Sequence, residues 1–254
     1  MDTFKAVFSY TVREHLRRKA WLSAALFGLV LIVGGLLAAS LAQDERARMM
    51  LDLGLAAIEA ITLLTAVFLT VHLILSEVES RAVYLILSHP VRRRDYLLGR
   101  FAGTMFAVIA TAAVMGLAHR GLMAAAGWPV DGSYALAWTF AMGQVAVMSA
   151  LALLLSLTLT SQEAAMVFTA FAWMLGHFTA EMRFLAERAP SPLARALLEG
   201  AARAVPDLAR LDYRDAIHGP APGPRWIAAA ALYALAYAAA CLALSTQVFE
   251  QKEF

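Results

Sequence analysis

The sequence predicts an all-α integral membrane protein with six transmembrane helices. Of its 254 residues, 61% are hydrophobic and 16% are charged, whereas about 25% of the residues in a soluble globular domain are charged. The apolar residues gather in six long stretches, at 21–42, 55–75, 101–118, 134–160, 164–180 and 226–248. About 20 apolar residues cross the hydrocarbon layer as a helix. The runs are continuous and lack a period of two, which excludes the strands of a barrel.

The composition also excludes several classes of protein. A mean hydropathy of +0.66 is too high for a soluble enzyme or a disordered chain. A net charge of +2 without a basic stripe gives no reason to expect a nucleic-acid partner. The single cysteine, Cys241, excludes a scaffold held together by intramolecular disulfides. Membrane lipids are therefore the first partner that the sequence predicts.

The distribution of charge predicts the orientation of the chain. Basic residues prevail in segments 1–20 and 76–100, whereas segment 43–54 between them is acidic on balance. Short loops rich in Lys and Arg stay in the cytoplasm, so both basic segments are expected there. Six spans then place both termini on the same side. The whole chain, 1–254, is expected to form one transmembrane domain, with an external loop at 181–225.

The N-terminal segment 1–20 has the pattern of an amphipathic helix. Its apolar residues recur at helical spacing, at Phe4, Val7, Phe8, Val12 and Leu16. A helix of this kind lies in the plane of the membrane interface. Two roles are open: a simple anchor on the lipid surface, or an elbow helix that also touches a cytoplasmic partner.

Segment 76–100 has too much internal order for a simple connection. Its first residues are charged, an apolar run covers 82–87, and Pro90 precedes a cluster of arginines at 92–94. Because proline breaks a helix, this order predicts two short helices that meet at a corner below the membrane. A solvated, positively charged loop is the alternative, but the apolar face favours docking onto another molecule.

The external loop 181–225 also contains helix signals. Ser191 followed by Pro192 is typical of a helix start, and Pro206 ends that helix. A second short helix is expected at 207–217. The two helices are expected to lie on the outer surface, where they either cap a translocation path or cover the ends of the membrane helices.

Few residues inside the apolar stretches can carry chemistry. Glu59 lies either at the rim of the membrane or in the lining of a polar cavity. Gln144 is expected either to hydrogen-bond between helices or to line such a cavity. The sequence has no metal-binding or nucleophile motif, and none of its lysines follows a glycine as in a phosphate-binding loop. Neither enzymatic catalysis nor ATP hydrolysis is therefore expected in this chain.

Segment 76–100 resembles the signature loop of type-2 ABC transporter permeases. The sequence departs from that loop at Arg81 and Ala82, where the family usually has Gly-Thr. Segments 205–212 and 248–254 are also similar to the family, and the most similar branch contains the nitrous-oxide-reductase maturation transporter. The matching positions in the loop are Glu77 and Glu79 for two acids, Pro90 and Val91 for a turn, Arg92, Arg93 and Arg94 for a basic position, and Gly99 and Arg100 for Gly-Lys.

The resemblance implies a permease subunit of an exporter, in a bacterial or archaeal cytoplasmic membrane. Such a subunit pairs with a second permease, either another copy or a homologue, and with cytoplasmic ATP-binding subunits that hold ATP and Mg²⁺. No cofactor is implied on this chain. An ATP-independent transporter or an assembly scaffold is the alternative. The residues implied in coupling to the ATPase are Glu77, Glu79, Arg81, Pro90, Arg92, Arg93, Arg94, Asp95, Gly99, Arg100, Gln162 and Glu163.

Overall fold

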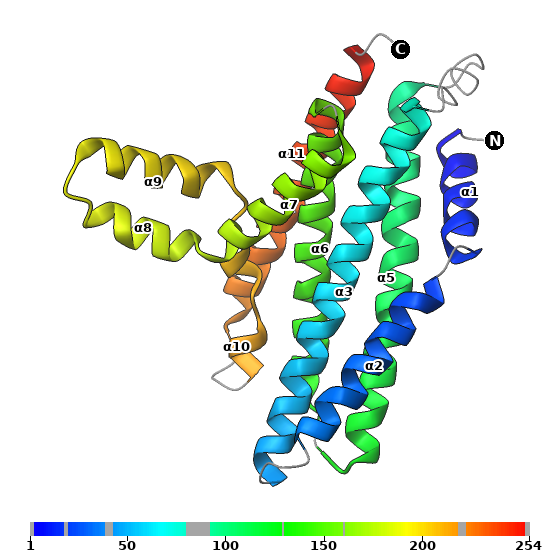
Figure 1. Ribbon diagram of the computed structural model, residues 1–254, viewed down its shortest axis with the longest axis vertical. Coiled ribbons are helices and arrows are strands. Elements are labelled where there is room, and N and C mark those ends of the chain that lie inside the picture. The colour runs from blue at the N-terminus through cyan, green and yellow to red at the C-terminus, as the bar shows by residue number, and fades with distance from the viewer. Residues whose placement is uncertain are drawn as a thin grey trace.

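Long helices packed side by side form the body of the protein (Figure 1). A computed structural model describes residues 3–17, 20–38, 43–79, 92–128, 130–159, 161–217 and 222–251. The described part is helical throughout, apart from turns and short connections. The first helices are α1 (Thr3–Arg17), α2 (Ala20–Ala38), α3 (Gln43–Glu79) and α5 (Arg93–Ala125). They are followed by α6 (Gly132–Thr158), α7 (Gln162–His177), α8 (Thr179–Glu187), α9 (Pro192–Ala204), the 3₁₀ helix η1 (Leu208–Leu211), α10 (Arg214–Ile217) and α11 (Pro224–Gln251).

Among the described residues, four helices are long and apolar enough to cross a membrane. They are Glu45–His72 within α3, together with α5, α6 and α11. These helices confirm the predictions for the second, third, fourth and sixth apolar stretches. The first stretch forms α2, whose apolar part, Leu22–Leu37, is shorter. The fifth stretch forms α7 and ends early, because the chain turns at Phe178 into α8.

Helix α6 occupies the centre of the bundle and packs against α3, α7 and α11. Its central residues Val145, Val147, Met148 and Ala150 are completely buried. A transmembrane helix that is apolar on all sides can pack against neighbours on all sides. The other long helices are arranged around it, and α1 lies outside them against α5 (Figure 1).

Two predicted connections are shorter than expected. Residues 43–54, expected as a loop, belong to α3, and Gly54 lies against the ring of His119 from α5. That ring also shares hydrogen bonds with the Met50 carbonyl oxygen (3.1 Å) and the Tyr134 hydroxyl (3.0 Å). These contacts hold the first part of α3 against α5 and α6. Segment 76–100 is likewise shortened, because residues 76–79 continue α3 and residues 93–100 already belong to α5.

The segment that is expected to form the external loop, called the outer loop here, folds over its described residues 181–217 into a hairpin and two short pieces. Helices α8 and α9 project away from the bundle (Figure 1). Ser191 caps α9 as predicted, since its hydroxyl accepts a hydrogen bond from the Ala194 amide at 3.1 Å. The helix predicted at 207–217 is wrong as a single element: it is divided into η1 and α10. On the exposed face of α9, a hydrogen bond from Arg195 lowers the pKa of Glu199.

Helix α1 packs across α5 at two glycines, Gly99 and Gly103. A methyl group on Gly103 would lie 2.7 Å from the Thr11 Cβ atom and 3.0 Å from the Phe8 carbonyl oxygen. Two glycines four residues apart form the small-residue face that lets two membrane helices approach closely. The side of α1 that meets α5 therefore includes Val7 and Thr11, and Thr11 is completely buried.

Substitution of Gly103 should weaken this contact. We expect Gly103→Ala to lower the free energy of unfolding by about 1–3 kcal/mol, because backbone and side-chain atoms of α1 must move. Gly121, also in α5, has open space around its Cα. Gly121→Ala should be neutral or stabilising by up to about 1 kcal/mol. Unfolding of both variants in mild detergent tests the difference, and equal effects would contradict the close contact.

Candidate functional site

One end of the bundle brings together five segments that are far apart in the sequence. They are α1, the end of α3, the start of α5, the turn between α6 and α7, and the end of α11 (Figure 1). The Arg93 guanidinium donates a hydrogen bond to the Glu250 carbonyl oxygen at 3.2 Å. The Tyr96 ring stacks on Phe249 with 6.4 Å between centroids, and Leu97 packs in the same cluster. The start of α5 is thus fixed to the end of α11.

The turn between α6 and α7 is tied to α3. The Ser161 hydroxyl accepts a hydrogen bond from the Ala164 amide at 3.1 Å and begins α7. The Gln162 Oε1 and His72 Nδ1 atoms are 3.3 Å apart. Below them, Val71, Ala152 and Ala165 form a small buried cluster. A displacement of this turn must therefore move α3, α6 and α7 together.

The predicted coupling residues fall into three groups. Arg92, Arg94 and Glu163 are exposed at this end of the bundle, and Arg93, Asp95 and Gln162 are half-buried. The exposed side chains present both signs of charge to the surroundings. Glu77 and Glu79 belong to the last turns of α3, but their side chains lie outside the described residues, as do Arg81 and Pro90 entirely.

The last of the three groups consists of Gly99 and Arg100, which are covered by α1. The Arg100 side chain is only 5% exposed, and its guanidinium is 2.9 Å from Glu14 Oε2. It also donates to the Thr11 hydroxyl at 3.2 Å and lies 5.5 Å from the centre of the Tyr10 ring. One turn further, the His15 ring is 2.9 Å from the Thr104 hydroxyl. The contacts of Arg100 and Thr104 thus hold α1 to α5.

Sequence reasoning missed the role of Glu14 and His15. The sequence places Glu14 on the polar side of the predicted amphipathic helix, and the pattern assigns no role to His15. The signal that could have found them is the pair of glycines at 99 and 103, because a glycine face predicts a partner helix and brings the polar residues of that helix close to Arg100.

Glu59 and Gln144 lie together inside the bundle. Both side chains are buried, and they line a cavity of about 10 Å³ with Asp212, Tyr213 and Arg214. Arg214 is 3.6 Å from Glu59 Oε2 and 3.3 Å from Asp212. Among the described residues, the Oε1 atoms of Glu59 and Gln144 have no hydrogen-bond partner. A cavity of this size has room for about one water molecule.

Asp207 connects the outer loop to the bundle. Its carboxylate accepts a hydrogen bond from Thr179 at 2.6 Å and pairs with Arg183 at 3.0 Å and Arg210 at 2.9 Å. Its backbone amide donates to the Tyr233 hydroxyl of α11 at 2.7 Å. One side chain thereby joins α8 and η1, and its backbone joins them to α11. The sequence gives no direct sign of these partners, because they come from distant segments.

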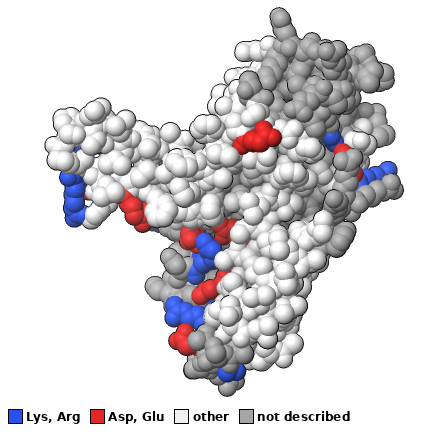
Figure 2. Space-filling model, in the orientation of Figure 1, with Lys and Arg blue, Asp and Glu red and all other residues white. Residues whose placement is uncertain are grey.

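The surface charge has an uneven distribution. Figure 2 shows that one face of the long helices is nearly without charged side chains, whereas charged atoms gather on the outer loop and at the ends of the bundle. Such a face suits contact with lipid. Within the described residues, no cluster of three or more His, Cys, Asp or Glu side chains could hold a metal ion.

Comparison with known proteins connects this architecture to one family. The sequence model described as "ABC-2 family transporter protein" matches residues 51–198. The matched segment runs from α3 to α9 and includes the start of α5 and the α6–α7 turn. No curated protein matches the chain.

A double-mutant cycle tests the Arg100–Glu14 pair. Arg100→Met should destabilise the protein more than Glu14→Gln, because it removes the buried positive charge that faces a partly buried carboxylate. We expect a coupling energy of about 1–2 kcal/mol from unfolding of the two single variants and the double variant. Arg94 and Asp95 provide the control pair, since they are 54% and 34% exposed and should couple by less than about 1 kcal/mol. Additive effects at Arg100 and Glu14 would contradict the assigned contact.

Loss of the Asp207 carboxylate should loosen the outer loop. Asp207→Ala removes the shorter of the two hydrogen bonds of the Thr179 hydroxyl, at 2.6 Å, and takes the carboxylate partner from two arginines. We therefore expect a loss of about 2–4 kcal/mol in unfolding free energy. Asp131→Ala is the matched control, because Asp131 accepts one hydrogen bond at the exposed start of α6 and should cost only about 1 kcal/mol. Protease cleavage within 181–217 should increase in the first variant alone. Unchanged cleavage there would argue against the role of Asp207.

Proposed function

The chain belongs to the ABC-2 family of transporter proteins, and we propose that its ATP-hydrolysing partner binds at the end of the bundle where the five segments meet. The chain is the transmembrane domain of such a transporter, a multi-pass membrane protein, and permeases of this kind lack ATPase activity. The energy for transport must therefore enter through a contact with another subunit. Under this proposal, ATP and Mg²⁺ are held by that subunit.

The observation that carries the proposal is the combination of exposed charge and rigid attachment at this end. Arg92 and Arg94 are exposed directly before and within the first turn of α5, and Glu163 is exposed at the first turn of α7. Both helices continue from these charges into the bundle without a break. A partner that binds the charges can displace whole helices, since packed helices move as rigid bodies.

The attachment of α1 extends this contact. The Arg100–Glu14 pair and the glycine contact bind α1 to the part of α5 that follows the exposed arginines. We propose that α1 is the elbow helix and moves with α5. Arg100 and Gly99 then contribute to coupling by holding α1, whereas Arg92, Arg94 and Glu163 touch the partner. Glu77, Glu79, Arg81 and Pro90 complete the contact in segment 76–92.

We further propose six spans, with both termini in the cytoplasm of a bacterium or archaeon. At about 1.5 Å per residue, the 19 residues of α2 extend about 28 Å, close to the hydrocarbon thickness of about 30 Å. The 16 residues of α7 fall short at about 24 Å. Helix α7 exposes the large apolar side chains of Val167, Phe168 and Phe171, which a second permease is expected to cover. We also propose, on the sequence motifs alone, that the chain belongs to the branch of the nitrous-oxide-reductase maturation transporter.

Glu59 and Gln144 are proposed as part of the translocation path. Their unpaired oxygens support this role, because a buried polar atom without a partner is stabilised once water or a polar cargo reaches it. The cavity that they share is small, so the path is closed at this level.

Purification in mild detergent tests the proposal directly. An ATPase that elutes with the chain in equal amounts, and whose activity depends on it, is the expected result. A chain that transports its cargo without any ATPase would overturn the proposal.

Charge reversal at the start of α5 locates the contact. We expect Arg92→Glu combined with Arg94→Glu to weaken binding of the ATPase about tenfold or more, which corresponds to about 1.4 kcal/mol. Arg120→Glu is the control, since Arg120 is exposed near the other end of the same helix. Co-purification yield and the affinity of the isolated partner measure the effect. Equal binding by both variants would place the contact elsewhere.

A further inference from the structure

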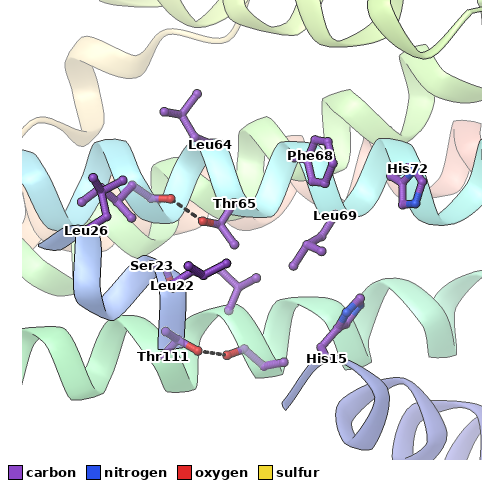
Figure 3. Close-up of a pocket in the computed structure, with 13 residues that line it drawn as sticks. His15, Leu22, Ser23, Leu26, Leu64, Thr65, Phe68, Leu69, His72 and Thr111 are labelled. Carbon is purple, nitrogen blue, oxygen red and sulfur yellow. Dashed lines mark hydrogen bonds between the residues drawn. The ribbon is translucent and has the colours of Figure 1, made fainter. Parts of the chain in front are cut away.

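A groove opens on the side of the bundle between α2, α3 and α5, near the end of α1 (Figure 3). Its volume is about 590 Å³, which lies in the range of sites that bind small molecules. The walls include Leu22 and Leu26 of α2 and Leu64 and Phe68 of α3, all of them exposed. Since α3 and α5 have the length and composition of membrane-crossing helices, the groove opens within the membrane.

The hydroxyl groups of the two threonines in the walls are hydrogen-bonded within their own helices. The Thr65 hydroxyl donates to the Ile61 carbonyl oxygen at 2.7 Å, and the Thr111 hydroxyl donates to the Ala107 carbonyl oxygen at 3.0 Å (Figure 3). Each threonine therefore turns its methyl group, rather than an unused hydroxyl, to the surroundings. Water in such a space would lose hydrogen bonds, and apolar cavities bind hydrocarbon instead. The walls thus select an apolar chain.

The dimensions of the groove fit one leaflet. Along α3 the lining extends from Ile61 to His72, a rise of about 16 Å at 1.5 Å per residue. Half of the hydrocarbon layer measures about 15 Å. Both histidines of the lining, His15 and His72, lie at the same end of the groove, and Leu26 lies towards the other (Figure 3). The groove therefore runs from the membrane interface to the middle of the bilayer.

We propose that this groove binds one acyl chain of a resident bilayer phospholipid, with the headgroup beside His15 and His72 and the terminal methyl beside Leu26. The imidazole rings are held in place, His15 by Thr104 at 2.9 Å and His72 by Gln162 at 3.3 Å. The ring nitrogen of His72 that does not contact Gln162 accepts a hydrogen bond from an ammonium or hydroxyl group of a headgroup. Lys5 and Arg13 lie exposed on α1, and their charge favours an anionic headgroup. The proposal does not depend on the ATPase partner.

Photo-crosslinking of the full-length chain in vesicles of phosphatidylethanolamine and phosphatidylglycerol tests the proposal. One phosphatidylglycerol probe carries a diazirine beside the headgroup, and a second carries it at the end of the acyl chain. The first probe is expected to label peptides that contain His15 and His72. The second is expected to label peptides that contain Leu26 and Ile61. Identical labelling by the two probes, or labelling spread evenly over α11, would overturn the proposal.

A matched pair of variants on α2 separates the groove from general lipid contact. Leu26 is 50% exposed and lines the groove, whereas Leu29 is 56% exposed and lies outside the lining. Leu26→Trp fills the groove and should lower crosslinking by the chain-end probe about tenfold, because several methylene groups lose their contacts. Leu29→Trp should leave crosslinking unchanged. Equal labelling of the two variants would overturn the proposal.

Two further measurements distinguish loss of lipid binding from loss of folding, and a resident lipid from cargo. The melting temperature of each variant shows whether the fold is retained, and Thr65→Phe fills the same groove from α3 if Leu26→Trp does not fold. Crosslinking is repeated with and without ATP in vesicles that contain the co-purified ATPase. An unchanged yield supports a resident lipid. A lipid that is released during ATP hydrolysis would be cargo, and this result would overturn the assignment to a resident lipid.

Discussion

A polar group inside a bilayer must find its partner within the protein, and this constraint decides where the helices of this chain touch. His119 of α5 meets the Tyr134 hydroxyl of α6 and the Met50 carbonyl of α3. Arg100 meets Glu14 of α1. Apolar packing alone would allow helices to slide, because lipid tails are as apolar as leucine. The buried polar contacts therefore fix the register in which α1, α3, α5 and α6 pack.

Contacts between distant segments also fix the ends of the protein. At the end that carries the exposed arginines, Arg93 and Tyr96 attach α5 to α11. In the outer loop, Asp207 joins α8, η1 and α11. Helix α11 thus connects a fixed point at one end with a fixed point in the loop. A displacement applied to α5 reaches the outer loop along one rigid helix, without any need for a continuous pathway of side chains.

The sequence predicts the features that depend on local pattern. The length of the apolar stretches predicts the four long helices, and Ser191 with Pro192 predicts the start of α9. Features that depend on contacts between distant residues cannot be predicted from the sequence pattern. The division of 207–217 into η1 and α10 follows partly from Asp207, which faces Thr179 and Arg183 rather than its own helix. Helix α1 buries Thr11 against α5, because the glycines of α5 leave room for it.

The helical periodicity of α5 explains why some of its arginines bond to other helices while their neighbours stay exposed. Arg93 and Arg100 are seven residues apart, which is about two turns of a helix, and each bonds to a neighbouring helix, Arg93 to α11 and Arg100 to α1. Arg92 and Arg94 flank Arg93 on either side and stay exposed. The sequence motif does not distinguish one arginine from another. Their positions on the helix do, because some arginines contact neighbouring helices and others are accessible to a partner. A single basic cluster therefore attaches α5 to its neighbours and, in our proposal, to the ATPase as well.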